Sequence, residues 1–142
     1  MTEHTPYPEN VPGDFYVEDG CCTMCEMPFA VAPDLFGEAQ NSAGCEHCFV
    51  KRQPRTPAEL GRMVDAIMCA ELQCIRYRGS NRLLQLRLIE VGEGVICDGL
   101  PPDLQAEVGR DEADRQRRWQ ERQRSQAAGR RPPASRPWWR FW

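Results

Sequence analysis

The cysteine spacing between residues 21 and 48 constrains the fold of this chain more than any other feature of its sequence. Five of the eight cysteines lie in this stretch, as Cys21-Cys22-x2-Cys25 and Cys45-x2-Cys48. Two C-x2-C pairs at this separation are typical of a four-thiolate metal site, because each pair turns the chain so that two sulfurs converge. The spacing therefore predicts a small domain built around zinc or an iron–sulfur centre, since both take soft sulfur ligands. His47, inside the second pair, either replaces one of its cysteines or is an exposed polar residue beside the ligands.

The rest of the sequence predicts the location of the protein in the cell. No stretch has the apolar length of a transmembrane helix, and the polar N-terminus lacks the regions of a signal peptide. We therefore expect a cytoplasmic protein, in which clustered cysteines are metal ligands more often than disulfides.

The net charge of −3 is unevenly distributed, because residues 110–142 contain ten Arg against four acidic residues, which is about +6. The sequence thus predicts an acidic body with a basic tail.

Short strands alternate with helices in the expected secondary structure, which indicates an α+β fold. The clearest helix begins at Thr56-Pro57-Ala58-Glu59, where Thr56 caps, Pro57 fits the first helical position and Glu59 completes a capping box. This helix should end near residue 72 and bury one apolar face. Asn81 caps a further helix. Strands are expected at residues 15–17, 48–50 and 74–77, a short helix at 28–32, and a turn-like segment at 37–44.

These elements divide the chain into four parts. Residues 1–13 are expected as an irregular lead-in and residues 14–79 as the cysteine-rich domain. Residues 80–109 form a helical extension packed on that domain. Residues 110–142 form an Arg/Trp-rich tail that is helical in part, over 111–128, and otherwise disordered.

The order of elements around the cysteines resembles that of small bacterial-type ferredoxins, which carry one 4Fe–4S or 3Fe–4S cluster. In that family C-x2-C-x2-C follows the first strand, and x3-A-P-x2-F often follows the third cysteine. Here Cys22 and Cys25 match the first two ligands, and residues 32–36 match the trailing segment. The resemblance covers roughly residues 14–79 and implies a ferredoxin-like cluster domain. Its main departure is Pro28, which stands at the third ligand position and cannot bind iron.

The resemblance also implies a ligand set and a function. The last ligand of the family comes from a cysteine near the end of the second helix, where Cys74 or Cys69 stands in this chain. The expected metal ligands are Cys22, Cys25, Cys48 and Cys74, with Cys21, Cys45, His47 and Cys69 as substitutes. A chain of this kind would carry electrons for a reductase or oxygenase, docking through its acidic body. We expect no enzymatic activity, because no general base, nucleophile pair or phosphate loop accompanies the cysteines.

Three other readings of the cysteines stay open. One is a zinc-stabilised, non-enzymatic binding module that presents its tail to a partner. Another is a ferredoxin scaffold without metal. In the third, Cys22-x2-Cys25 is a dithiol redox pair, although the βαβ context of such a pair is missing.

The tail ends in a cluster of aromatic residues and arginine that is costly to leave unused on a surface. Its expected partner-binding residues are Trp138, Trp139, Arg140 and Trp142. We expect a protein partner for this segment and do not expect nucleic acid.

Overall fold

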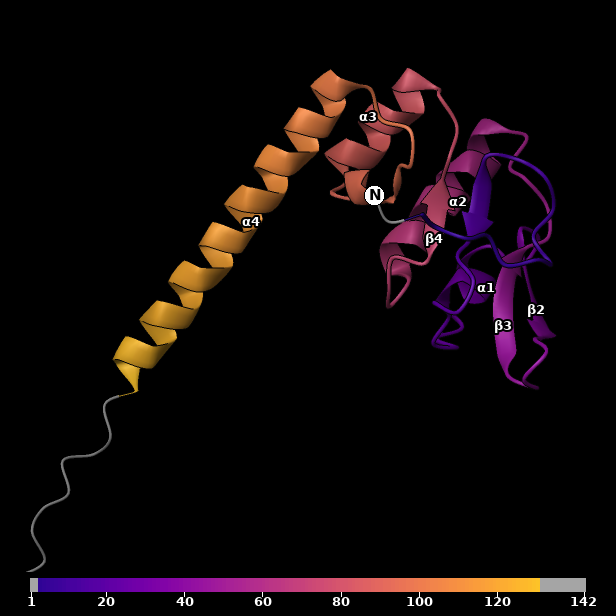
Figure 1. The fold of residues 1–142 in the computed structure, drawn as a ribbon, viewed down its shortest axis with the longest axis horizontal. Coiled ribbons are helices and arrows are strands. Elements are labelled where there is room, and N and C mark those ends of the chain that lie inside the picture. Colours follow the sequence, from indigo (N-terminus) through magenta and orange to yellow (C-terminus); the bar gives the residue numbers. More distant parts are fainter. Residues whose placement is uncertain (1–2, 131–142) are drawn as a thin grey trace, which may run out of the picture. The chain divides into compact units, whose positions relative to one another are not determined.

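Short strands and helices alternate along the protein, as the computed structural model shows for the residues it describes, 3–130 (Figure 1). In chain order they are β1 (Phe15–Val17), α1 (Met27–Val31), β2 (Phe36–Gln40), β3 (Glu46–Val50), α2 (Pro57–Cys69), β4 (Ile75–Tyr77), α3 (Arg82–Glu90), a 3-10 turn (Gly94–Ile96) and α4 (Pro102–Gly129). This combination is the α+β class that the sequence predicts. The chain divides into two compact units, Met1–Leu104 and Gln105–Trp142. Among the described residues, no helix combines the length and apolar character that crossing a bilayer requires.

The first unit contains two small antiparallel sheets. β1 pairs with β4, with Phe15 opposite Tyr77, and β2 pairs with β3 in a hairpin, with Phe36 opposite Val50. The strand β2 corrects the turn expected at residues 37–44. Gly37 lies opposite Phe49, and a Cβ atom at residue 37 would come within 2.8 Å of the Phe49 ring. This glycine therefore makes room for an aromatic ring within a strand and does not end one.

The helices begin where their capping residues predict. Thr56 Oγ1 accepts a hydrogen bond from Glu59 N at 3.1 Å, and Asn81 caps α3 by accepting one from Leu84 N at 3.3 Å. The Glu59 carboxylate reaches back one residue further than a standard capping box, to Arg55 N at 2.7 Å. The helix α4 begins well before the predicted residue 111, because Pro102 fits a first helical turn and Asp103 pairs with Arg82.

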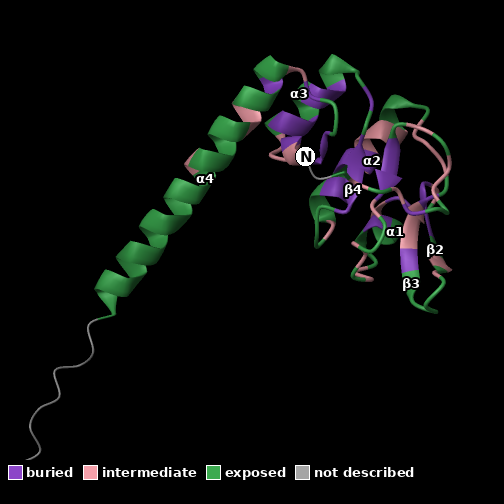
Figure 2. Ribbon diagram, viewed as in Figure 1, coloured by how far each residue is buried: buried purple, intermediate pink, exposed green. Residues whose placement is uncertain are grey.

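The core of the first unit lies between the β1–β4 sheet, α2 and α3 (Figure 2). Its largest fully buried side chains are Tyr16, Leu35, Phe36, Met63, Ile75, Tyr77, Leu88 and Ile96. Burial of one such apolar side chain contributes about 1.5–3 kcal/mol. The buried Arg76 is satisfied within this core, because its guanidinium donates to Asp98 at 2.7 Å and to Val95 O at 3.1 Å.

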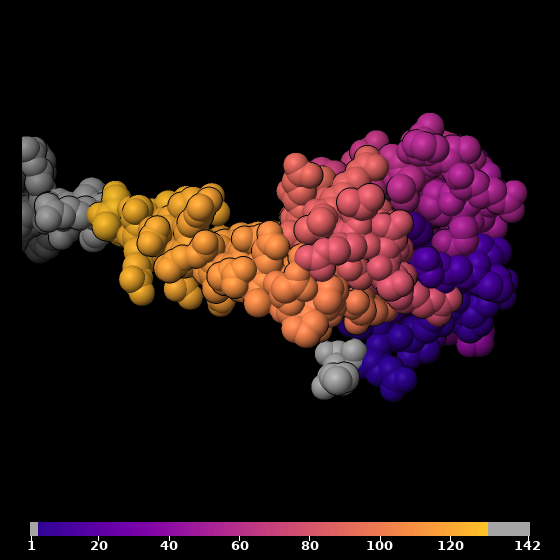
Figure 3. Space-filling model, turned by 90° about the horizontal axis from the view of Figure 1, so that it is seen from above, coloured from indigo at the N-terminus to yellow at the C-terminus, as the bar shows by residue number. Residues whose placement is uncertain are grey.

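The N-terminal segment is irregular, as expected, but it packs into the body of the unit. The Asn10 side chain connects the two sheets: Oδ1 accepts from Val17 N of β1 at 3.0 Å and from Val50 N of β3 at 2.9 Å. Its amide nitrogen donates to Tyr7 O and Val17 O. Gln53 similarly satisfies both backbone groups of Phe15, so the N-terminal segment and the chain leading into α2 lie side by side (indigo and magenta, Figure 3).

Candidate metal centre

Cys22 and Cys48 meet where the loop after β1 crosses the hairpin strand β3. Cys22 Sγ accepts hydrogen bonds from two backbone N–H groups, of Cys48 at 3.3 Å and of Met24 at 3.4 Å. Cys22 Sγ, Cys48 Sγ and a ring nitrogen of His47 all lie within 4.8 Å of one another. These three groups could hold a metal ion, and backbone N–H groups that donate to sulfur are a common feature around metal-bound thiolates.

Cys25 lies on one small cavity with Cys22 and Cys48, and His47 does not line this cavity. A cavity of about 10 Å³ is lined by Cys22, Cys25 and Cys48 together with Met24, Glu26, Pro28, Phe29 and Glu38. Met24 and Glu26, on either side of Cys25, have left-handed backbones with φ of 59° and 60°. Non-glycine residues adopt this conformation at a cost of roughly 1–2 kcal/mol each, so the surrounding contacts must hold the loop in it. The curled loop thereby brings Cys22 and Cys25 to one cavity, as the C-x2-C spacing predicts.

His47 is buried, with only 3% of its surface exposed, which corrects the reading of it as an exposed polar residue. Its Nδ1 lies 2.8 Å from Cys48 O, and its Nε2 lies 3.1 Å from Gly20 N. A carbonyl oxygen can only accept and a backbone N–H can only donate, so Nδ1 carries the proton and Nε2 presents its lone pair. The ring also stacks on Tyr7, with 4.0 Å between the ring centroids. Tyr7 belongs to the N-terminal segment, and no motif in the sequence pointed to its role here.

The cavity is unfavourable for several thiolates without a cation. Burial raises the pKa of the Cys48 thiol well above its ordinary value of 9.0, and a hydrogen bond with Cys22 and the negative charges of Cys22 and Cys25 raise it further. Like charges brought together out of water disfavour one another. A bound metal cation would replace the thiol protons and reverse this balance.

A disulfide overturns two of the expected ligand assignments. Cys21 and Cys74 are bonded to each other, with 5.5 Å between their Cα atoms. Cys74 is therefore not a thiolate ligand in this structure, and Cys21 is not its substitute. The bond lies just beyond the paired strands β1 and β4, where Val17 stands opposite Ile75. Strand pairing, which the spacing of cysteines does not reveal, brings these two residues together.

The second C-x2-C pair does not form a knuckle. Cys48 lies in β3, and Cys45 is exposed at the end of the hairpin turn, where its N–H bonds to the Asn41 side chain. Cys45 is not among the residues that line the cavity around Cys22, Cys25 and Cys48. Cys69 is exposed at the end of α2, and Cys97 is buried elsewhere in the unit. The predicted tail residues Trp138, Trp139, Arg140 and Trp142 lie outside the described residues.

Comparison of the chain with protein-family models, with curated proteins and with solved structures finds no match. The resemblance to single-cluster ferredoxins therefore stays a prediction.

Proposed function

We propose that this protein is a zinc-stabilised, non-enzymatic binding module whose zinc ion is held by Cys22, Cys25, Cys48 and His47. The observation that carries the proposal is the convergence of Cys22, Cys48 and the His47 imidazole within 4.8 Å. A third thiol, of Cys25, lines one cavity with the two cysteines. Three cysteines and one histidine are a common ligand set of structural zinc sites.

The distances favour a single ion over a cluster. Tetrahedral zinc with Zn–S bonds of about 2.3 Å places its sulfurs roughly 3.8 Å apart, which small side-chain movements can reach from the observed arrangement. An iron–sulfur cluster binds its thiolates to different irons and needs room for several irons and sulfides. An imidazole beside two thiols also suits zinc, whereas the usual ligands of a 4Fe–4S cluster are four thiolates. The electron carrier remains the second candidate, favoured by the two N–H groups that donate to Cys22 Sγ.

His47 has the hydrogen-bond arrangement of a metal-ligating imidazole. Such residues donate their second ring N–H to a carbonyl or carboxylate, which fixes the tautomer and the ring orientation. The Nδ1 contact with Cys48 O and the stack on Tyr7 provide both. Zinc binding at Nε2 would exchange the Gly20 N–H for the metal. The ion would then tie the loop after β1 to the hairpin, so that binding free energy becomes folding free energy.

Metal analysis of purified protein tests this proposal, with Cys48→Ser as the site variant and Cys45→Ser as its matched control three residues away. We expect about one zinc per chain in the wild type and in Cys45→Ser, and none in Cys48→Ser. Equal loss of zinc in both variants would show that the two C-x2-C pairs bind the metal after all. Iron and sulfide in similar amounts, with a coloured protein, would establish the cluster instead.

A further inference from the structure

The C-terminal half of α4 is a strongly basic, exposed helix. Residues 115–129 contain five arginines and one acidic residue, Glu121, which is a net charge of about +4. Every residue in this range is exposed (green, Figure 2). Trp119 is its only large apolar residue, and 56% of its surface is exposed. This half of the helix therefore buries no apolar face of its own.

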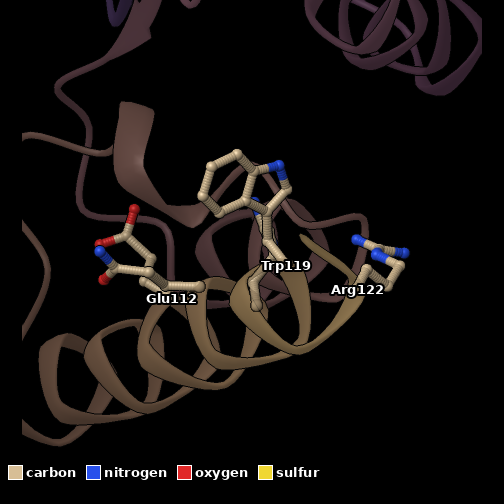
Figure 4. Close-up of a pocket in the computed structure, with 5 residues that line it drawn as sticks. Glu112, Trp119 and Arg122 are labelled. Carbon is tan, nitrogen blue, oxygen red and sulfur yellow. The ribbon is translucent and has the colours of Figure 1, made fainter. Parts of the chain in front are cut away.

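The charges are sorted around the helix axis as well as along it. With about 100° per residue, Arg115, Arg118 and Arg122 lie on one flank, and Arg117 and Arg124 on another roughly 140° away. Between the two flanks, on the narrower side, lie Asp114 and Glu121. The wider side carries uncharged residues up to Ala127: Gln116, Trp119, Gln120, Gln123, Gln126 and Ala127. Figure 4 shows Trp119 projecting from this side of α4, with Arg122 beside it on the neighbouring flank.

The helix dipole does not account for this sorting. Acidic residues near the start of α4 and basic residues near its end do complement the dipole, but that effect acts within the first and last turns. It does not distinguish one face of the helix from another. Arg117 pairs with Asp114, whereas Arg118, Arg122 and Arg124 have no acidic partner in the part of the chain that the structure describes. Their charge is therefore available to a polyanion.

We propose that residues 115–129 of α4 bind double-stranded DNA by lying in its major groove. That groove admits an α-helix and is bordered by a phosphate backbone on each side. Arginines on two flanks of one helix match these two rows of phosphates, which guanidinium groups bind bidentately. The glutamines between the flanks would face the base edges, where glutamine pairs with adenine N6 and N7. Asp114 and Glu121 would face solvent, away from the phosphates.

Other partners fit this surface less well. A protein groove that takes a helix reads apolar anchors at i, i+3, i+4 and i+7, and a membrane surface needs an apolar face. Trp119 alone supplies neither. Double-stranded RNA has a major groove too narrow for side chains to read. The inference departs from the expectation that nucleic acid is not a partner, because the basic charge is concentrated on the exposed half of α4.

This inference names the partner of the proposed binding module, and so rests on that function. We would measure binding of the full chain to a short mixed-sequence DNA duplex by fluorescence anisotropy, at salt concentrations from about 50 to about 200 mM. Phosphate contacts of Arg118, Arg122 and Arg124 predict a fall in affinity of about 40-fold over this range. The variant Arg118→Gln/Arg122→Gln should reduce the slope of log affinity against log salt by about 2. Arg110→Gln, in the same helix but outside the basic half, should leave the slope nearly unchanged.

Several results would overturn the inference. These are equal slopes for the double variant and the Arg110→Gln control, equal affinity for an RNA duplex, or salt-sensitive self-association of the chain in sedimentation experiments without DNA. Circular dichroism of each variant checks that α4 stays helical. Cys48→Ser separates the two proposals. DNA binding by this variant without zinc would support the DNA proposal independently of the metal. Zinc binding by the wild type without DNA binding would overturn the DNA proposal and leave the zinc-module proposal standing.

Discussion

Removal of the Cys21–Cys74 disulfide should destabilise the protein by about 4 kcal/mol. The bond joins residues separated by 53 positions. Closing a loop of that length lowers the entropy of the unfolded chain by about 14 cal/mol/K, which is about 4 kcal/mol at 25 °C. The native state should keep its structure without the bond, because β1 and β4 remain paired and Glu18 N still donates to Cys74 O at 2.8 Å. The effect therefore comes mainly from the unfolded state.

Urea unfolding of Cys21→Ser/Cys74→Ser against the wild type, at one fixed zinc concentration, measures this difference. Cys69→Ser is the matched control, because Cys69 is an exposed free thiol. Adding a phosphine reductant, which is not a thiol ligand for zinc, should bring the wild type to the stability of the double variant and leave the variant unchanged. Thiol titration in denaturant provides a second measurement: six cysteines should react before reduction and all eight after it.

Two results would refute this reasoning. Eight reactive thiols without reductant would show that the bond does not form in solution, and Cys74 would again be a candidate ligand. A loss below about 1 kcal/mol, with the thiol count as expected, would mean that the unfolded chain keeps these residues close together.

Two further changes test the scaffold of the site. Asn10→Asp keeps the oxygen that accepts from Val17 N and Val50 N, but it replaces the donating amide group with a carboxylate oxygen that faces two carbonyls. The free energy of unfolding, measured by urea titration, should therefore fall by about 2 kcal/mol. Hydrogen bonding to Arg62 lowers the pKa of Asp34 from 3.8 to about 2, so its stabilising contribution is present above pH 4 and is lost as the pH falls towards 2. Asp34→Asn should therefore flatten the acid-unfolding curve in that range, whereas Asn at the exposed Asp65 should not; identical curves for both variants would contradict the assignment.

The sequence predicts those elements whose signals are local. The start of α2 depends on Thr56 and Glu59, which lie three residues apart, and the start of α3 depends on Asn81. The convergence of Cys22 and Cys25 likewise depends on a short loop. The strand β2 was missed because the function of Gly37 depends on Phe49, which stands opposite it in the hairpin.

The errors at the candidate site have the same origin. Cys45-x2-Cys48 has the spacing of a knuckle, but β3 begins at Glu46. Cys48 therefore lies in a strand and Cys45 in the turn before it, and only Cys48 lines the cavity. Strand pairing of β1 with β4 likewise brings Cys74 to Cys21. His47 is buried by Tyr7, forty residues earlier in the chain. Cysteine spacing alone contains none of these long-range contacts.

Cys22 and Cys48 belong to parts of the chain that long-range contacts hold together, and a metal bound to both would strengthen the same junction. Cys22 follows β1 and Cys48 lies in β3, and Asn10 connects these same two strands. Zinc bound to both cysteines would make a second connection between the same pieces. The Asn10 hydrogen bonds and the zinc would connect the same two parts of the chain, so their contributions to stability should not be additive. The cost of Asn10→Asp should therefore be smaller with zinc bound than after chelation, and an equal cost in both conditions would mean that the metal, if bound, does not bridge the two strands.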